Sequence, residues 1–279
     1  MSSTITTMPR TTLRGGTSIP QVGFGVFQVP DAETTRAVSL ALEAGYRSVD
    51  TAAVYGNEAG VGRALAESGL ARDDVFVTSK LWIDSLARDA VRPALERSLE
   101  LLGLDRLDLY LIHWPSPARG RYVEAWEGLV AARDAGLVRE IGVSNFEPAH
   151  LRALVDATGE TPAVNQVELH PALQQRALRD VHAELEIVTE AWSPLGQGTV
   201  LDDPTVVRVA AAHGVTPAQV VLRWHLEQGT VVIPKSVTPA RIASNLDVLG
   251  FALTADEVAA IDALDAAGRI GPHPDTFEG

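Results

Sequence analysis

Short apolar runs alternate with helical patterns along the chain, and this alternation constrains the fold more than any other feature. Each apolar run has the length of a buried strand, and a segment with helical spacing of apolar residues follows each one. Eight such units within 279 residues favour a closed (β/α)8 barrel, the TIM barrel, over an open sheet. The expected strands are residues 21–27, 48–50, 75–81, 107–113, 140–144, 163–168, 186–192 and 231–234.

The two ends of the chain add elements to this barrel. The turn signal Arg14-Gly15-Gly16-Thr17 predicts an N-terminal β-hairpin over residues 11–19. Extra C-terminal helices are expected, the last over residues 254–264. Residues 1–279 are predicted to form a single barrel domain, because no linker or low-complexity run divides them. Within it, residues 1–10 are expected to be a loose N-terminal arm, and residues 268–279 a C-terminal tail over the active-site face.

Composition excludes several classes of function. The net charge of −13 argues against binding to nucleic acid or to anionic membranes. The absence of cysteine excludes disulfides, thiolate nucleophiles and cysteine metal sites, and no other metal signature is present. No signal peptide and no apolar run of membrane-spanning length is recognisable. We therefore expect a cytoplasmic chain, and a monomer because no sequence feature calls for an interface.

The chain has 21 arginines and only two lysines, Lys80 and Lys235, and both follow apolar runs near predicted strand ends. Arginine cannot replace lysine where a compact ammonium group or a tunable pKa is needed. Lys80 therefore becomes a candidate for chemistry, although two surviving surface lysines would give the same count.

Acid–base side chains end three successive predicted strands. They are Asp50 with Tyr55, then Lys80, then His113. The carboxyl ends of barrel strands converge on one face, so these four groups should meet there. A Lys80 ammonium held by Asp50 would lower the pKa of the Tyr55 phenol, and His113 could bind the oxygen that is protonated. The alternative is that Asp50 caps a helix, Tyr55 packs, Lys80 is a surface charge and His113 is a core histidine.

The remaining strand ends suggest a dinucleotide site. Ser144, Asn145 and Gln166 suit a carboxamide, and Trp192 offers a flat face for an aromatic ring. A run with two cations and hydroxyl groups at a helix start predicts an anion site, and two cations favour NADPH over NADH. That run consists of Lys235, Ser236, Val237, Thr238 and Arg241. Gly23 and Gly25 are not a Rossmann fingerprint, because Gln28 stands where the third glycine would be.

Ordered motifs over nearly the whole chain resemble the aldo-keto reductase family. The motifs are Gly23-Phe24-Gly25, Asp50-Thr51-Ala52-x-x-Tyr55-Gly56-Asn57-Glu58, Thr78-Ser79-Lys80-Leu81-Trp82, Asp108-Leu109-Tyr110-Leu111-Ile112-His113-Trp114-Pro115, Ile141-Gly142-Val143-Ser144-Asn145-Phe146, Asn165-Gln166-Val167-Glu168 and Ile233-Pro234-Lys235-Ser236-Val237. Within the family, the run from Trp192 to Gly198 and the short tail are similar to bacterial 2,5-diketo-D-gluconic acid reductases.

The resemblance implies a catalytic tetrad of Asp50, Tyr55, Lys80 and His113, with Tyr55 as general acid. It also implies cofactor and substrate contacts in five groups. These are Ser144, Asn145, Gln166 and Trp192 for the nicotinamide; Ser193, Leu195 and Gln197 for the pyrophosphate; Lys235, Ser236 and Arg241 for the 2′-phosphate; Gly25, Val237, Thr238 and Asn245 for the rest of the cofactor; and Phe27, Trp82, His113, Trp114 and Phe146 for the substrate.

Two positions depart from the family pattern. Trp192 stands where many relatives have Tyr, and Ser244 precedes Asn245 where many have Glu. The first change preserves stacking, and the second weakens the expected hydrogen bonding to adenine.

The predicted activity is NADPH-dependent reduction of aldehydes or ketones to alcohols, with α-dicarbonyls or keto-sugars such as 2,5-diketo-D-gluconate as substrates. Two other hypotheses remain open from the residues. Lys80 could form a Schiff base in a barrel aldolase. The chain could also bind NADPH as a regulatory subunit that turns over little.

Overall fold

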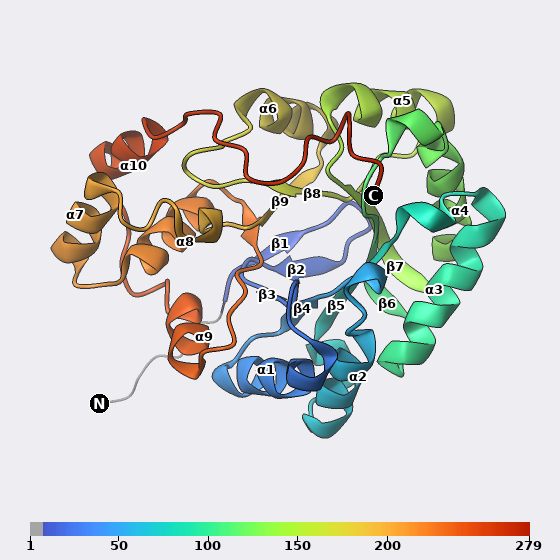
Figure 1. The fold of residues 1–279 in the computed structure, drawn as a ribbon, viewed down its shortest axis with the longest axis horizontal. Helices are drawn as coiled ribbons and strands as arrows, with labels where there is room; N and C mark the ends of the chain where they lie inside the picture. The colour runs from blue at the N-terminus through green and yellow to red at the C-terminus, as the bar shows by residue number, and fades with distance from the viewer. Residues whose placement is uncertain (1–7) are drawn as a thin grey trace.

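The computed structural model describes residues 8–279, and eight parallel strands form the centre of the molecule (Figure 1). Neighbouring strands follow chain order from β3 to β10. The strands are β3 (Phe24–Gly25), β4 (Ser48–Asp50), β5 (Phe76–Leu81), β6 (Leu107–Ile112), β7 (Val138–Ser144), β8 (Val164–Glu168), β9 (Val188–Trp192) and β10 (Val231–Val232). A parallel bridge between Val22 and Val232 joins the first strand region to the last. The predicted (β/α)8 fold is confirmed.

Helices surround the strands, mostly one between each strand and the next (Figure 1). They are α1 (Asp31–Ala44), α2 (Glu58–Glu67), α3 (Arg88–Leu102), α4 (Tyr122–Asp134), α5 (Pro148–Thr158), α6 (Arg176–Leu185), α7 (Pro204–His213), α8 (Pro217–Glu227), α9 (Pro239–Leu246) and α10 (Ala255–Asp262). Short 3-10 turns are η1 (Ala53–Tyr55), η2 (Arg72–Asp74), η3 (Ile83–Ser85), η4 (Pro117–Arg119) and η5 (Gly196–Gly198). Within residues 8–279 no single helix could cross a membrane; α7 and α8 together would pass by length and composition, but they meet at 91°.

Local sequence signals set several of these boundaries. Gly45 ends α1 in the left-handed conformation, with φ 110°, where a side chain would be strained. The Thr216 side chain accepts a hydrogen bond from the Gln219 N–H and so caps the start of α8. The first and last strands are shorter than the predicted 21–27 and 231–234. Proline has no N–H for a strand hydrogen bond, and Pro234 lies just beyond β10.

An N-terminal hairpin lies at the end of the barrel where the strands begin. Strands β1 (Arg10–Thr12) and β2 (Ser18–Pro20) pair antiparallel, as predicted. Leu13 and Ile19 join a buried apolar cluster with Phe76, Leu109 and residues of later strands. Residues 1–7 of the expected loose arm lie outside the described residues, and Arg10 already belongs to β1.

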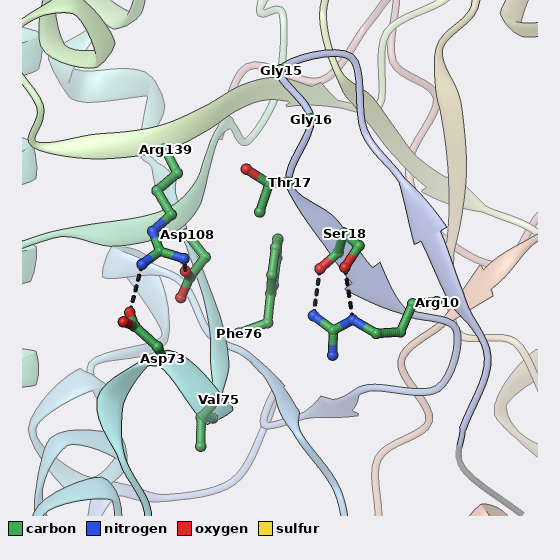
Figure 2. A pocket seen from close by; sticks show the side chains of 10 residues that line it. All are labelled: Arg10, Gly15, Gly16, Thr17, Ser18, Asp73, Val75, Phe76, Asp108 and Arg139. Atoms are coloured by element: carbon green, nitrogen blue, oxygen red, sulfur yellow. Dashed lines mark hydrogen bonds and ion pairs between the residues drawn. The ribbon is translucent and has the colours of Figure 1, made fainter.

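A polar cavity of about 520 Å³ opens between the hairpin and the amino ends of β5, β6 and β7 (Figure 2). Its arginines already have partners in the lining, since Arg139 pairs with Asp73 and Arg10 donates to the Ser18 hydroxyl. This cavity lies at the end of the barrel opposite to the predicted catalytic residues. Barrel enzymes carry their chemistry at the carboxyl ends of the strands, so the site is sought there.

Candidate active site

The four predicted catalytic residues occupy neighbouring strand ends on one face. Asp50 is the last residue of β4, and Lys80 is the next-to-last residue of β5. His113 directly follows β6, and Tyr55 ends η1 in the loop after β4. Because β4, β5 and β6 are hydrogen-bonded neighbours, their order brings these residues together.

A buried ion pair lies at the base of the site. Lys80 is 0% exposed, so it is not the surface charge that the alternative interpretation required. Its Nζ lies 2.6 Å from Asp50 Oδ1 and donates a second hydrogen bond to the Thr51 carbonyl at 2.9 Å. The same ammonium lies 5.1 Å from the centre of the Tyr55 ring. A buried ammonium needs such partners to offset its lost hydration, and here it has them.

These contacts keep both Lys80 and Tyr55 protonated near neutral pH. Burial alone lowers the pKa of Lys80, but the Asp50 carboxylate and the Tyr55 phenol outweigh it, so its pKa is raised. Burial raises the pKa of Tyr55, and the Lys80 charge opposes that rise without reversing it. The ammonium therefore lowers the Tyr55 pKa as expected, but desolvation has the larger effect, so the net pKa is raised in the protein alone.

His113 contributes a neutral imidazole to the same wall. Burial, followed by the Lys80 charge, holds the pKa of His113 well below its usual range. Its ring meets Tyr55 edge-on at 5.6 Å and Trp82 edge-on at 5.2 Å between centroids. Its Nδ1 has no hydrogen-bond partner among the described residues. A neutral imidazole can donate one hydrogen bond without bringing a second positive charge beside Lys80.

A chain of hydrogen bonds joins the ends of β7, β8 and β9. The Trp192 indole N–H donates to Asn145 Oδ1 at 2.8 Å. Asn145 Nδ2 donates to the His113 carbonyl at 3.0 Å and to Ser144 Oγ at 3.1 Å, and Ser144 Oγ donates to the Gln166 carbonyl at 2.8 Å. The predicted carboxamide and stacking residues therefore form one connected wall, attached to His113.

Gln166 also reaches across the barrel interior to the ion pair. Its Nε2 donates to Asp50 Oδ2 at 2.8 Å and to Glu190 Oε2 at 2.9 Å. Glu190 is the register partner of Gln166 in β9 and is buried. Burial, then the neighbouring Asp50 charge, raises the pKa of Glu190 to about 7. Glu190 was not among the predicted site residues, because a lone acidic residue inside a strand is usually solvent-facing.

The predicted anion site forms an exposed patch at the start of α9. Lys235, Val237, Thr238 and Arg241 are exposed and Ser236 is half-buried. The Thr238 N–H donates to Ser236 Oγ at 3.2 Å, and the Thr238 side chain makes no capping bond. Arginine, lysine and helix N–H groups thus remain available to an anion on this surface. Asn245 lies buried near the end of the same helix.

The pyrophosphate candidates follow β9 in a tight loop. Ser193 and Gln197 both have left-handed backbone, with φ 47° and φ 52°, and Leu195 precedes the η5 turn. Gly25 lies across from this region, where a side chain would come within 2.9 Å of the Ile233 carbonyl. Its role in the structure is the close approach of β3 to the segment after β10.

Three predicted pocket aromatics gather above the tetrad. Phe27 is 50% exposed and packs 5.1 Å from the Tyr55 ring, and Trp82 packs on His113. Trp114 packs at 4.3 Å on Phe277, a tail residue that sequence reasoning missed. Phe146 is not part of this group, since it is buried edge-on against Tyr122 and His150.

The C-terminal tail crosses this end of the barrel and is attached at two points. The Ile270 and Gly271 N–H groups donate to the Glu168 carboxylate at 2.6 and 2.9 Å. Near the chain end, Glu278 accepts a hydrogen bond from Ser116 at 2.6 Å. In Figure 1 the red tail runs from α10 past α6 and α5 to the C-terminus. These attachments hold Phe277 beside the pocket tryptophans.

Within residues 8–279, no three His, Asp or Glu side chains gather in a way that could hold a metal ion. The buried charges of the site are instead satisfied by one another and by Gln166. The arrangement therefore supplies a phenol, an ammonium, a neutral imidazole and a wall of amides.

Known proteins resemble this chain over nearly its whole length. The Aldo/keto reductase family profile matches residues 21–266. An aldo-keto reductase of Mycolicibacterium smegmatis is 55% identical over 269 residues, covering 96% of this chain and 98% of the relative. Methylglyoxal reductase DkgA of Escherichia coli is 51% identical over 269 residues, covering 96% and 97%. A solved structure of a Gox0644 mutant in complex with NADPH is 50% identical, with a TM-score of 0.94 and coverage of 97% and 99%. The predicted family is confirmed: the chain belongs to the aldo/keto reductase family and is an oxidoreductase.

Proposed function

We propose that this protein reduces the carbonyl group of small aldehydes and ketones to an alcohol, with NADPH as reductant and Tyr55 as proton donor. The observation that carries the proposal is the buried Lys80–Asp50 pair at 2.6 Å, with its ammonium beneath the Tyr55 ring and the neutral His113 beside it. A related structure, the Gox0644 mutant, was solved in complex with NADPH.

The residues present fit a nicotinamide cofactor. The half-buried Trp192 offers a ring face, held in place by its bond to Asn145. Ser144, Asn145 and Gln166 bring hydroxyl and amide groups to the same wall. Lys235 and Arg241 leave two exposed cations near the start of α9, which suits a 2′-phosphate in addition to the pyrophosphate. We assign the pyrophosphate to the loop of Ser193, Leu195 and Gln197.

When bound, NADPH supplies the hydride that reduces the carbonyl carbon. The side chains of the protein protonate the carbonyl oxygen. As negative charge develops there, the Tyr55 phenol donates its proton, and the Lys80 ammonium stabilises the phenolate left behind. Asp50 holds Lys80 in place, and His113 is placed to donate a hydrogen bond to the same oxygen. The raised pKa of Tyr55 keeps the proton available at neutral pH before substrate binds.

Aromatic side chains surround the proposed substrate site. Phe27, Trp82, Trp114 and Phe277 present flat apolar faces beside the tetrad. We propose α-dicarbonyls such as methylglyoxal as the first class, because the relative DkgA is a methylglyoxal reductase. Keto-sugars such as 2,5-diketo-D-gluconate are the second class. We also keep the proposals of a monomer and of a cytoplasmic location.

The Schiff-base interpretation of Lys80 finds no support in the site. A nucleophilic lysine needs an unprotonated amine, which a lowered pKa provides. Here the Asp50 carboxylate helps to raise the pKa of Lys80, and the ammonium is fully enclosed. Lys80 is therefore better suited to stabilise charge than to form a covalent bond with substrate.

The test is NADPH consumption by the purified protein with methylglyoxal and a panel of small carbonyls, beside the Tyr55→Phe variant. We expect wild-type turnover and a loss of at least about 100-fold in kcat for Tyr55→Phe. NADPH binding, followed by quenching of tryptophan fluorescence, should stay within about twofold. Unchanged turnover in Tyr55→Phe would remove Tyr55 as the acid. Tight NADPH binding without turnover of any carbonyl would favour the regulatory-subunit hypothesis.

A further inference from the structure

The amide nitrogen of Gln166 has both of its hydrogens committed. One is donated to Asp50 Oδ2 at 2.8 Å and the other to Glu190 Oε2 at 2.9 Å. A side-chain amide nitrogen carries two hydrogens and no more. All three side chains are at most 3% exposed, so water does not compete easily for these bonds.

These two acceptors fix which way the Gln166 amide faces. A flipped amide would set its carbonyl oxygen against carboxyl oxygens of both Asp50 and Glu190, while leaving its N–H groups without them. The observed orientation leaves Gln166 Oε1 as the atom available to a ligand, and no side-chain donor of residues 8–279 bonds to it. Without Glu190, Asp50 would accept only one of the two Gln166 amide hydrogens. The second hydrogen could then be donated to a carbonyl group of the ligand.

We propose that Glu190 is a positioning residue which, by holding the second Gln166 hydrogen, makes Gln166 an acceptor that selects the carboxamide NH2 of the nicotinamide. The inference rests on the proposed use of NADPH and adds a residue to it. Glu190 acts through Gln166 and does not need to touch the cofactor. Glu190 therefore changes the relative affinity for ligands with and without a carboxamide NH2, in addition to any effect on protein stability.

The experiment compares NADPH with its 3-acetylpyridine analogue, which has an acetyl group in place of the carboxamide. The analogue keeps the carbonyl acceptor but lacks the NH2 donor. Dissociation constants come from tryptophan quenching, with no turnover required. For wild type we expect NADPH to bind about tenfold more tightly than the analogue, the value of one hydrogen bond at a buried acceptor.

Two variants separate the hydrogen bond from the charge. Glu190→Met keeps the volume but removes the acceptor, and we expect the preference for NADPH to narrow to about twofold. Glu190→Gln also removes the charge, but its amide oxygen can still accept from Gln166, so it should keep a preference near tenfold. If both variants changed the preference equally, the charge alone would be responsible and the inference would be overturned.

Glu140→Gln is the matched control, because Glu140 is a buried strand carboxylate at the hairpin end, bonded to the Gly15 and Thr17 N–H groups. It should leave the preference unchanged. An unchanged preference in a folded Glu190→Met would overturn the inference while leaving the proposed function intact. Failure of wild type to bind NADPH would overturn both. Equal binding of both ligands by wild type would overturn only the inference.

Discussion

At the scale of single residues, the site depends on the buried ion pair of Lys80 and Asp50, in which water cannot replace either partner. Lys80→Met would leave the Asp50 carboxylate buried without its ammonium. We expect a loss of about 3–5 kcal/mol in the free energy of unfolding, measured by urea denaturation at pH 7. Asp50→Asn added to Lys80→Met removes the unpaired charge, so the double variant should be less destabilised than the sum of the singles. Additive losses would show that the two groups are stabilised independently.

Residues also show where sequence reasoning reached its limit. The convergence of the tetrad was predictable, because each member lies at the carboxyl end of a strand or in the short loop that follows it, and parallel strand ends meet. Glu190 was not, since its importance comes from facing inward beside Gln166, and one acidic residue within a strand gives no such signal. Phe146 was predicted to line the pocket, but its ring packs against Tyr122 and His150.

At the scale of elements, prediction succeeded where local chemistry decides. The bounds of α1, from Asp31 to Ala44, follow from an amphipathic pattern that Gly45 ends, so local sequence is enough to set them. The strand predicted over residues 21–27 is observed only as β3, Phe24–Gly25. Its length was not predictable, because strand pairing depends on neighbours that are distant in sequence. The contact of Phe277 with Trp114 lies equally beyond local patterns, since 163 residues separate them along the chain (277 − 114).

The tail gives a prediction about substrate binding. Phe277→Ala removes one aromatic wall but leaves the Glu278 and Glu168 attachments in place. We expect the KM for methylglyoxal to rise about fivefold with kcat nearly unchanged, because the lost contact acts equally in the ground and transition states. Phe251→Ala is the control, since Phe251 packs on His213 away from the pocket. A fall in kcat at constant KM would assign Phe277 to the chemical step instead.

At the scale of the whole molecule, buried histidines make stability depend on pH. His182 Nε2 lies 2.9 Å from Asn165 Nδ2 and its Nδ1 lies 2.8 Å from Thr189 Oγ1, so a charged ring would place a donor against the Asn165 amide. Burial lowers the pKa of His182 to about 4 and that of His225 to about 3. Between these values and about 6.5 the unfolded chain binds more protons than the native state, so stability rises with pH.

Each such histidine should add about 1.4 kcal/mol per pH unit to the free energy of unfolding between pH 4.5 and 6. Glu190 acts in the opposite direction over this range, because its pKa is raised and the native state holds the extra proton. His113 is a third buried histidine with a lowered pKa, so among these groups the net slope is positive up to about pH 6. Above about pH 6.5 only Glu190 of these groups still titrates, and stability falls as the pH passes through about 7. His182→Gln should remove the contribution of one proton from the slope of unfolding free energy against pH. Urea titrations at pH 4.5, 5.5, 6.5 and 7.5 measure that slope. A parallel loss at every pH would mean that His182 contributes packing and hydrogen bonds but no proton linkage.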